Sequence, residues 1–172
     1  MQIELLTFRS ARAKLDDLID LLQDAVDSGA SVGFLPPLLP DVASDYWHSV
    51  LTDLDAGHRI LLGAMDGSKL VGSAQLELAR KPNASHRAEV QRLLVLQSAR
   101  RQGIGEELMR RLHELAREHG RTLLVLDTRA GDPSELLYQK LGYTRAGVIP
   151  GYARSADGAL DATAFYYLFV PA

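Results

Sequence analysis

The sequence contains no cysteine, and aromatic residues make up only 6% of its 172 residues. The absence of cysteine excludes disulfide bonds, thiolate metal ligands and covalent catalysis through a thiol. No apolar run is long enough to span a bilayer, and the first residues show no basic stretch followed by the apolar segment of a signal peptide. These absences lead us to expect a protein of the cytoplasm.

Charge of neither sign dominates the composition. The chain has 19 Lys and Arg against 22 Asp and Glu, a net charge of −3 and a pI of about 5.9. General nucleic-acid binding usually requires a basic surface, so this balance argues against it. The length and the 47% hydrophobic content predict one domain over residues 1–172, which can bury a full core without disulfides or metal ions.

Hydrophobic periodicity predicts alternating strands and helices. The expected strands cover residues 2–8, 58–65, 70–79, 87–96, 122–128, 143–149 and 162–170. The expected helices cover residues 11–28, 41–56, 104–119 and a segment from Asp132 to just before Gly142. Asp41 and Asp132 are predicted N-caps, and Glu135 is expected to complete a capping box with Asp132. This order of elements predicts an α/β or α+β sheet with helices on both faces.

The most informative segment is Arg100-Arg101-Gln102-Gly103-Ile104-Gly105, which lies between an apolar strand and a long amphipathic helix. Two glycines at such a junction expose successive backbone N–H groups at the positive end of a helix. That geometry binds phosphate groups, so the segment predicts a pyrophosphate cradle.

Two known phosphate-binding loops do not fit this segment. A P-loop would need Gly-Lys-Ser/Thr, but Gly105 is followed by two glutamates. A Rossmann loop would make Asp127 the ribose ligand, but its third glycine position holds Leu108, and residues 97–102 separate the strand from the first glycine. Taken alone, the two glycines also fit an ordinary connection between a strand and a helix.

The wider pattern Arg100-x-x-Gly103-x-Gly105 resembles the cofactor loop of the GNAT family of N-acetyltransferases. Leu93-Leu94-Val95 is similar to the family strand whose backbone pairs with the pantetheine arm, and residues 136–143 resemble the family's tyrosine helix with its following glycine-aromatic pair. The predicted order of elements also follows the family. The resemblance implies a mixed, mostly antiparallel central sheet of about seven strands, flanked by helices on both faces.

Four shorter segments resemble one branch of the family, the tabtoxin-resistance acetyltransferases, which act on a small β-lactam amino acid. These segments are Ala30–Phe34, Arg87–Gln91, Leu126–Thr128 and Pro150–Tyr152. The chain departs from many family members at Gly131, where they carry an asparagine seven residues before the tyrosine. The side-chain contact of that asparagine to the cofactor must therefore be absent or replaced.

The resemblance implies acetyl-CoA as the cosubstrate. The backbone amides of residues 101–106 would hold its pyrophosphate, with Arg100 or Arg101 adding a charge-assisted contact. The residues expected to bind acetyl-CoA are Leu93, Leu94, Val95, Arg100, Arg101, Gln102, Gly103, Ile104, Gly105 and Glu106.

Three side chains are candidates for catalysis. Tyr138 is the candidate general acid that protonates the departing thiolate, although its spacing also fits ordinary core packing. Asp127 and Glu89 are candidate bases, because an alkyl amine is mostly protonated at neutral pH and must lose a proton before it attacks. Asp127 could instead cap the following turn, and Glu89 could pair with Arg87 or Arg92.

Strand alternation predicts that Glu89 shares a face with Gln91, Leu93 and Val95. The oxyanion of the reaction would be held by a backbone N–H of residues 93–95, which a β-bulge of the family type would free. A substrate wall is expected from Phe34, Trp47, Tyr152 and the proline-rich loop over residues 30–40.

The sequence therefore predicts an N-acetyltransferase that moves an acetyl group from acetyl-CoA to a small amine. The acceptor is expected to be amino-acid-like or antibiotic-like, with direct transfer in a ternary complex because no cysteine can carry the acetyl group. Two alternatives stay open: a non-catalytic acyl-CoA-binding or sensor domain, and an acetyltransferase of protein N-termini or lysines. We expect a monomer or homodimer with no metal, nucleic-acid or membrane partner.

Overall fold

A computed structural model describes residues 1–171, and its strands form one sheet of seven in the order β1-β2-β3-β4-β5-β7-β6. The strands are β1 (Gln2–Leu6), β2 (Arg59–Asp66), β3 (Lys69–Leu78), β4 (Arg87–Val95), β5 (Leu123–Arg129), β6 (Thr144–Arg154) and β7 (Leu160–Phe169). Only β4 and β5 pair in parallel, and all other neighbours are antiparallel. The expected mixed, mostly antiparallel sheet is confirmed.

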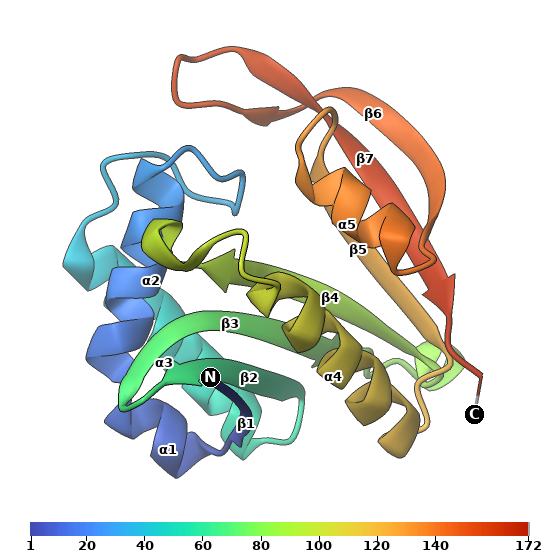
Figure 1. Cartoon of the computed structure of the whole chain (residues 1–172). Coiled ribbons are helices and arrows are strands. Elements are labelled where there is room, and N and C mark those ends of the chain that lie inside the picture. Colours follow the sequence, from blue (N-terminus) through green and yellow to red (C-terminus); the bar gives the residue numbers. More distant parts are fainter. Residues whose placement is uncertain (172) are drawn as a thin grey trace.

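Five α-helices and two short 3-10 helices surround this sheet. They are α1 (Phe8–Ala13), α2 (Leu15–Asp27), α3 (Pro40–Asp55), α4 (Ile104–Glu118), α5 (Ser134–Lys140), η1 (Pro82–Ala84) and η2 (Gln97–Ala99). Helices α2 and α3 pack on one face of β2–β4, α4 packs on the other, and α5 lies over the end formed by β5 and β7 (Figure 1). No helix within residues 1–171 has the length and apolarity needed to cross a membrane.

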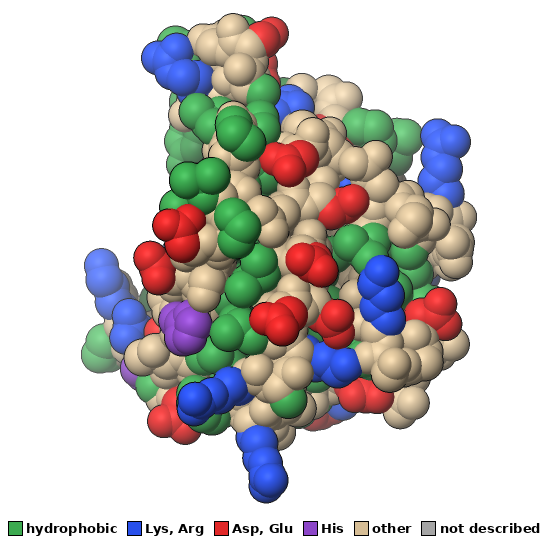
Figure 2. Space-filling model, turned by 90° about the vertical axis from the view of Figure 1, so that its left-hand side faces the viewer, with side chains coloured by type: hydrophobic (Ala, Val, Ile, Leu, Met, Phe, Trp, Pro, Cys, Tyr) green, Lys and Arg blue, Asp and Glu red, His purple; other side chains and the backbone are tan. Residues whose placement is uncertain are grey.

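The apolar stripes of the long helices meet the sheet in one continuous core. Leu18, Leu22 and Trp47 are fully buried from α2 and α3, as are Leu108 and Leu112 from α4. The outer side of α2 and α3 is acidic (Figure 2), because every Lys, Arg, Asp or Glu position between Lys14 and Arg59 is an aspartate.

The single helix expected over residues 11–28 is wrong, because the structure divides it into α1 and α2 at Lys14 (φ −109°, ψ 19°). The first helix also begins earlier than expected. Thr7 and Ser10 exchange side-chain and backbone hydrogen bonds in a capping box, which starts α1 at Phe8 and shortens β1 to Leu6.

Neither Asp41 nor Asp132 occupies the N-cap position predicted for it, because Leu39 and Pro133 are the N-caps of α3 and α5. Leu39 is the N-cap of α3 and Pro40 occupies the first helical position, so Asp41 lies in the first turn. At α5, the Asp132 Oδ1 does accept a hydrogen bond from the Ser134 N–H (3.0 Å), but Glu135 reaches the Gly131 N–H (2.6 Å) and not Asp132. The capping box expected between Asp132 and Glu135 is therefore wrong. The left-handed Gly131 (φ 86°) instead ties the preceding turn to α5.

The parallel pairing of β4 and β5 is short and ends at Glu89 and Val125. Beyond that point β4 stays paired with β3 as far as Val95, whereas β5 stays paired with β7 as far as Arg129. The two strands therefore diverge in the middle of the sheet (Figure 1), and this divergence positions the candidate site.

Candidate active site

The divergence of β4 and β5 opens a cavity of about 320 Å³. Residues 89–93 of β4, Asp127 and Thr128 of β5, Tyr138 of α5, residues 30–33 and part of β6 line it. The three candidate catalytic side chains, Glu89, Asp127 and Tyr138, thus lie in the walls of one cavity although they are far apart in the sequence. This arrangement brings two carboxyl groups and a phenol, which can accept and donate protons, to one cavity.

Asp127 lies two residues beyond the last parallel pair of β4 and β5. At this position β5 pairs with β7 alone, and Phe165 is the partner of Asp127. Its side chain is open to the cavity, but the cavity walls remove part of its hydration. This burial raises the pKa of the Asp127 carboxyl, and the positive charge of Arg92 partly opposes the rise. A carboxyl with a raised pKa is a better proton acceptor than an ordinary surface aspartate.

Tyr138 is buried and held between two other aromatic rings. Its ring centroid lies 5.9 Å from that of Tyr143 and 6.1 Å from that of Tyr166. Burial raises the pKa of the Tyr138 phenol well above its usual range, and the nearby carboxylates of Asp132 and Asp127 add to the rise. The phenol therefore keeps its proton at neutral pH, as a general acid must.

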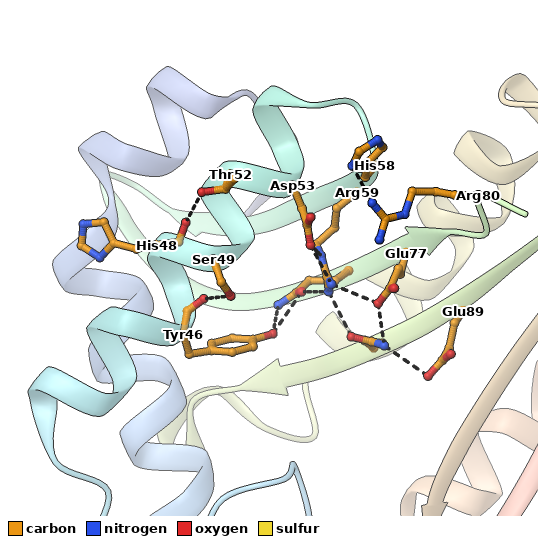
Figure 3. A network of polar contacts seen from close by, with 12 residues as sticks. Tyr46, His48, Ser49, Thr52, Asp53, His58, Arg59, Glu77, Arg80 and Glu89 are labelled. Carbon is orange, nitrogen blue, oxygen red and sulfur yellow. Dashed lines mark hydrogen bonds and ion pairs between the residues drawn. The ribbon is translucent and has the colours of Figure 1, made fainter.

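Glu89 is held in place by a polar network that sequence reasoning did not find (Figure 3). The Gln91 Nε2 donates to the Glu89 Oε1 (3.2 Å) and to the Glu77 Oε2 (2.9 Å). The Arg59 guanidinium, from β2, donates in turn to the side-chain oxygens of Gln91 (3.0 Å), Gln75 (2.8 Å) and Glu77 (3.0 Å). Figure 3 shows the network extending from α3 across β2 and β3 to β4.

The structure also tests whether Glu89 forms the ion pair with Arg87 or Arg92 that was the alternative to a role as a base. Neither Arg87 nor Arg92 forms an ion pair with Glu89 within the described chain, so the alternative of a simple surface pair is not what the structure contains. The Glu89 carboxylate faces the cavity with one oxygen fixed by Gln91.

The β-bulge that the family resemblance led us to expect lies in β4. Gln91 pairs with Gln75 and Leu94 pairs with Ser73, so Arg92 and Leu93 together oppose the single residue between them on β3. Arg92 absorbs the irregularity with a positive φ of 49°. The bulge interrupts the backbone ladder of β3 and β4 beside the cavity and leaves its extra residue outside the regular pairing.

Because of the bulge, the predicted orientation of the side chains of β4 is partly wrong. Glu89 and Gln91 share a face, as expected, but Leu93 lies on the other side of the sheet against Gly105 of α4, where its Cδ2 would meet an added Cβ at 3.8 Å. The extra residue reverses the alternation, because side chains change face at every residue of a regular strand. Leu93 and Val95 therefore line the α4 side of the sheet.

The glycine segment has the geometry of an anion cradle. Arg101 (φ 62°) and Gly103 (φ 83°) adopt left-handed conformations, and Gly103 is the N-cap of α4. Within residues 1–171, the backbone amides of residues 101–106 donate no hydrogen bond to the protein. A Cβ built on Gly103 would meet nothing within 4 Å, so the cradle is open on that side.

The two adjacent arginines of this segment have different surroundings. The Arg100 guanidinium donates to the Val95 carbonyl (3.0 Å) and the Ser28 Oγ (2.8 Å), and lies 3.8 Å from Asp24. It ties the loop to α2. The Arg101 side chain is exposed and makes no ion pair within the described residues. Glu106, in the first turn of α4, pairs with Arg110 and Lys140.

The expected substrate wall is partly wrong. Trp47 is fully buried in the core, because its helix turns that side chain toward the sheet. Tyr152 lines the candidate cavity, whereas Phe34 lines a second, neighbouring cavity of about 210 Å³. Sequence reasoning gave no role in the site to Tyr46, whose ring packs against Phe34 with centroids 5.5 Å apart.

No group of three or more potential metal ligands occurs among residues 1–171.

Comparison with known proteins gives the same fold throughout. An N-acetyltransferase from Staphylococcus aureus Mu50 superposes with a TM-score of 0.83 at 22% identity, over 99% of this chain and 98% of that one. A proposed acetyltransferase from Salmonella typhimurium, solved with its cofactor acetyl-CoA, gives 0.82 at 17% identity over 100% and 95%. A proposed phosphinothricin N-acetyltransferase gives 0.80 at 20% identity over 99% of each chain.

A family model described as acetyltransferase (GNAT) family matches residues 20–143. This range contains all three candidate catalytic residues, the bulged strand β4 and the whole glycine segment. The match covers well over half of the sequence, and the chain belongs to the acetyltransferase (GNAT) family.

Proposed function

We propose that this protein transfers an acetyl group from acetyl-CoA to the amine of a small acceptor, directly and in a ternary complex. The observation that carries the proposal is the meeting of Glu89, Asp127 and Tyr138 around one cavity, next to the bulge of β4. The absence of cysteine from the whole sequence supports direct transfer without a thioester on the protein.

The amine proton would leave through the acidic side of the cavity. A protonated amine cannot attack a thioester, so a carboxylate must take up its proton first. Asp127 suits this role because its pKa is raised by burial, and Glu89 suits it because Gln91 fixes one of its oxygens and leaves the other to the cavity. We assign the first proton transfer to Asp127, with Glu89 orienting the ammonium group.

The residues of the cradle fit the cosubstrate. The unpartnered amides of residues 101–106 would hold the diphosphate, with Arg101 rather than Arg100 adding side-chain charge, since Arg100 is already tied to α2. When bound, acetyl-CoA supplies the acetyl thioester and a thiolate leaving group. The Tyr138 hydroxyl would donate its proton to that thiolate, and a backbone N–H at the bulge would stabilise the oxyanion.

The size and walls of the cavity support a small acceptor over a protein. A volume of about 320 Å³ suits a small ligand, and residues 30–33 and Tyr152 wall the cavity opposite β4. A protein N-terminus or a lysine would need an open groove. One fold neighbour is described as a proposed phosphinothricin N-acetyltransferase, in keeping with this assignment.

The test is release of CoA from acetyl-CoA with a panel of small amines, amino acids and peptides. We expect turnover with small acceptors and little with peptides. Acetyl-CoA binding by calorimetry without turnover for any acceptor would favour the sensor alternative. Faster turnover with peptides than with every small amine would favour the protein acetyltransferase.

A further inference from the structure

Arg92 is the one side chain of the bulge that turns toward the loop over residues 30–40. Its Cζ lies 4.9 Å from the ring centroid of Tyr46 and 5.6 Å from that of Phe34. Its Nη2 lies against Gly33, where an added Cβ would approach to 3.2 Å. Two aromatic faces and a glycine therefore hold the guanidinium in one place in the cavity wall.

No carboxylate lies within ion-pairing distance of Arg92 among residues 1–171, although its positive charge acts on the Asp127 carboxyl from further away. Within residues 1–171 its guanidinium takes part in no ion pair and no side-chain hydrogen bond, and its buried Nε is unpartnered. Arg59, Arg100 and Arg129 all have carboxylate neighbours within 4 Å. Aromatic rings interact with the flat face of a guanidinium and leave its in-plane N–H donors unsatisfied.

The other charged residues of the cavity wall are all acidic. Glu89, Asp127 and Asp132 line the same cavity as Arg92. A dianion such as a phosphate monoester would be repelled by these carboxylates, whereas a zwitterion would place its cation near them and its carboxylate at the arginine. The planar fork of a guanidinium also matches the two oxygens of a carboxylate.

We propose that Arg92 binds the carboxylate of the acceptor, and that the acceptor is a small amino acid whose amine faces Asp127 and Glu89. This inference rests on the proposed acetyltransferase function and specifies its substrate class. Arg92 is thereby a specificity-determining residue, and the aromatic pair Phe34 and Tyr46 holds it in position.

The first experiment compares acceptors that differ only in the carboxylate. These are the proteinogenic amino acids, their α-carboxamides and their decarboxylated amines. For the native protein, we expect kcat/KM to be about 10- to 100-fold higher for the best amino acid than for its amide or amine, as a charge-assisted bidentate contact allows. Arg92→Gln should remove this preference, because it should lower kcat/KM for the amino acids by a much larger factor than for the amides and amines. Arg92→Lys should keep part of it, because the charge remains but the fork is lost.

Arg87→Gln is the matched control, since Arg87 is an exposed residue of the same strand outside the cavity. It should leave the preference intact. Equal turnover of amino acids and their amines by the native protein would overturn the proposal. So would an equal loss of activity on every acceptor in Arg92→Gln, because a purely structural role predicts that result.

The second experiment does not depend on turnover. Nitrogen–proton NMR spectra of the arginine Nε–H groups, with the Arg92 signal assigned from Arg92→Lys, are recorded while the same compounds are added in the presence of CoA. We expect the Arg92 signal to shift with amino acids and not with their amides. Such a shift without any CoA release would support the anion site and contradict the acetyltransferase function. CoA release with no shift for any amino acid would overturn the anion site and leave the function standing.

Discussion

Glu89 and Val125 form the last parallel pair between β4 and β5, and both candidate bases, Glu89 and Asp127, lie at or just beyond this point. Two residues further along β5, Asp127 has a partner on β7 and none on β4. The divergence leaves space between the two strand backbones, and Glu89 and Asp127 line the cavity that forms there.

Tyr138→Phe should lower kcat by about 10- to 1,000-fold, the usual range for loss of a general acid. Affinity for acetyl-CoA should change little, because the cradle of residues 101–106 lies on another element. Stopped assays of CoA release and calorimetry check the two quantities. Tyr167→Phe, which removes a hydroxyl from a ring on β7 outside the cavity, is the control. Unchanged kcat in Tyr138→Phe would remove this residue from the mechanism.

Asp127→Asn should lower kcat/KM by about 100- to 10,000-fold and abolish its fall at acid pH. Burial raises the pKa of Asp127, so in the folded protein the ionised form is disfavoured and the cost appears as the pH rises through that pKa. The asparagine variant should therefore be slightly more stable than the native protein at pH 7, with an advantage that shrinks toward acid pH. Urea denaturation at several pH values measures this, with the exposed Asp55→Asn as control. A native pH profile retained by Asp127→Asn would assign the base to another group.

Gly103→Ala and Gly120→Ala form a matched pair at the two ends of α4. Both glycines have positive φ, 83° and 65°, and neither would place a Cβ within 4 Å of another group. Each variant should lose about 1 kcal/mol of stability from the left-handed backbone. Only Gly103→Ala should weaken acetyl-CoA binding, which calorimetry would measure. Equal affinity in the two variants would argue against the cradle.

Arg100→Ala and Arg101→Ala should differ although the residues are adjacent. Arg100 joins the glycine segment to β4 through the Val95 carbonyl and to the end of α2 through Ser28, so its removal should lower both the melting temperature and the affinity for acetyl-CoA. Arg101 is exposed, so its removal should lower the affinity alone, and by less as salt is added. Loss of stability in Arg101→Ala would contradict this division of roles.

His113 should make the protein sensitive to acid. Burial lowers the pKa of His113 to about 4, with the charges of Arg117 and Arg110 adding to the effect, and its Nε2 lies 3.0 Å from the Tyr143 hydroxyl. A histidine with a lowered pKa contributes stability above its ordinary pKa of 6.5, and this is lost as the pH falls toward 4. The free energy of unfolding should fall by up to about 1.4 kcal/mol per pH unit in this window.

His113→Gln should flatten that slope in urea denaturation, because glutamine does not titrate. The exposed His86→Gln should keep it. An identical slope in the native protein and His113→Gln would mean that other groups carry the acid sensitivity.

Much of the fold followed from local patterns. The amphipathic helix α4 and the strands β2, β3 and β5 all lie where hydrophobic periodicity predicts them, apart from small shifts at their ends. The errors lie where one residue overrides a pattern. Lys14 divides a continuous helical stripe, and Leu39 with Pro40 takes the N-cap position expected of Asp41. Such choices depend on hydrogen bonds whose geometry a hydrophobic pattern does not encode.

By itself, the sequence determined the elements, the glycine segment before α4 and the three residues proposed for catalysis, because spacing and residue type are local properties. Only the tertiary structure decided how they act together. It placed the end of the β4–β5 pairing at Glu89, moved Leu93 to the other face through the bulge, turned Arg100 toward α2 and left Arg92 with no carboxylate at ion-pairing distance in the described part of the chain. Strand register and side-chain pairing join residues distant in the chain, so their energies depend on neighbours that no local window contains.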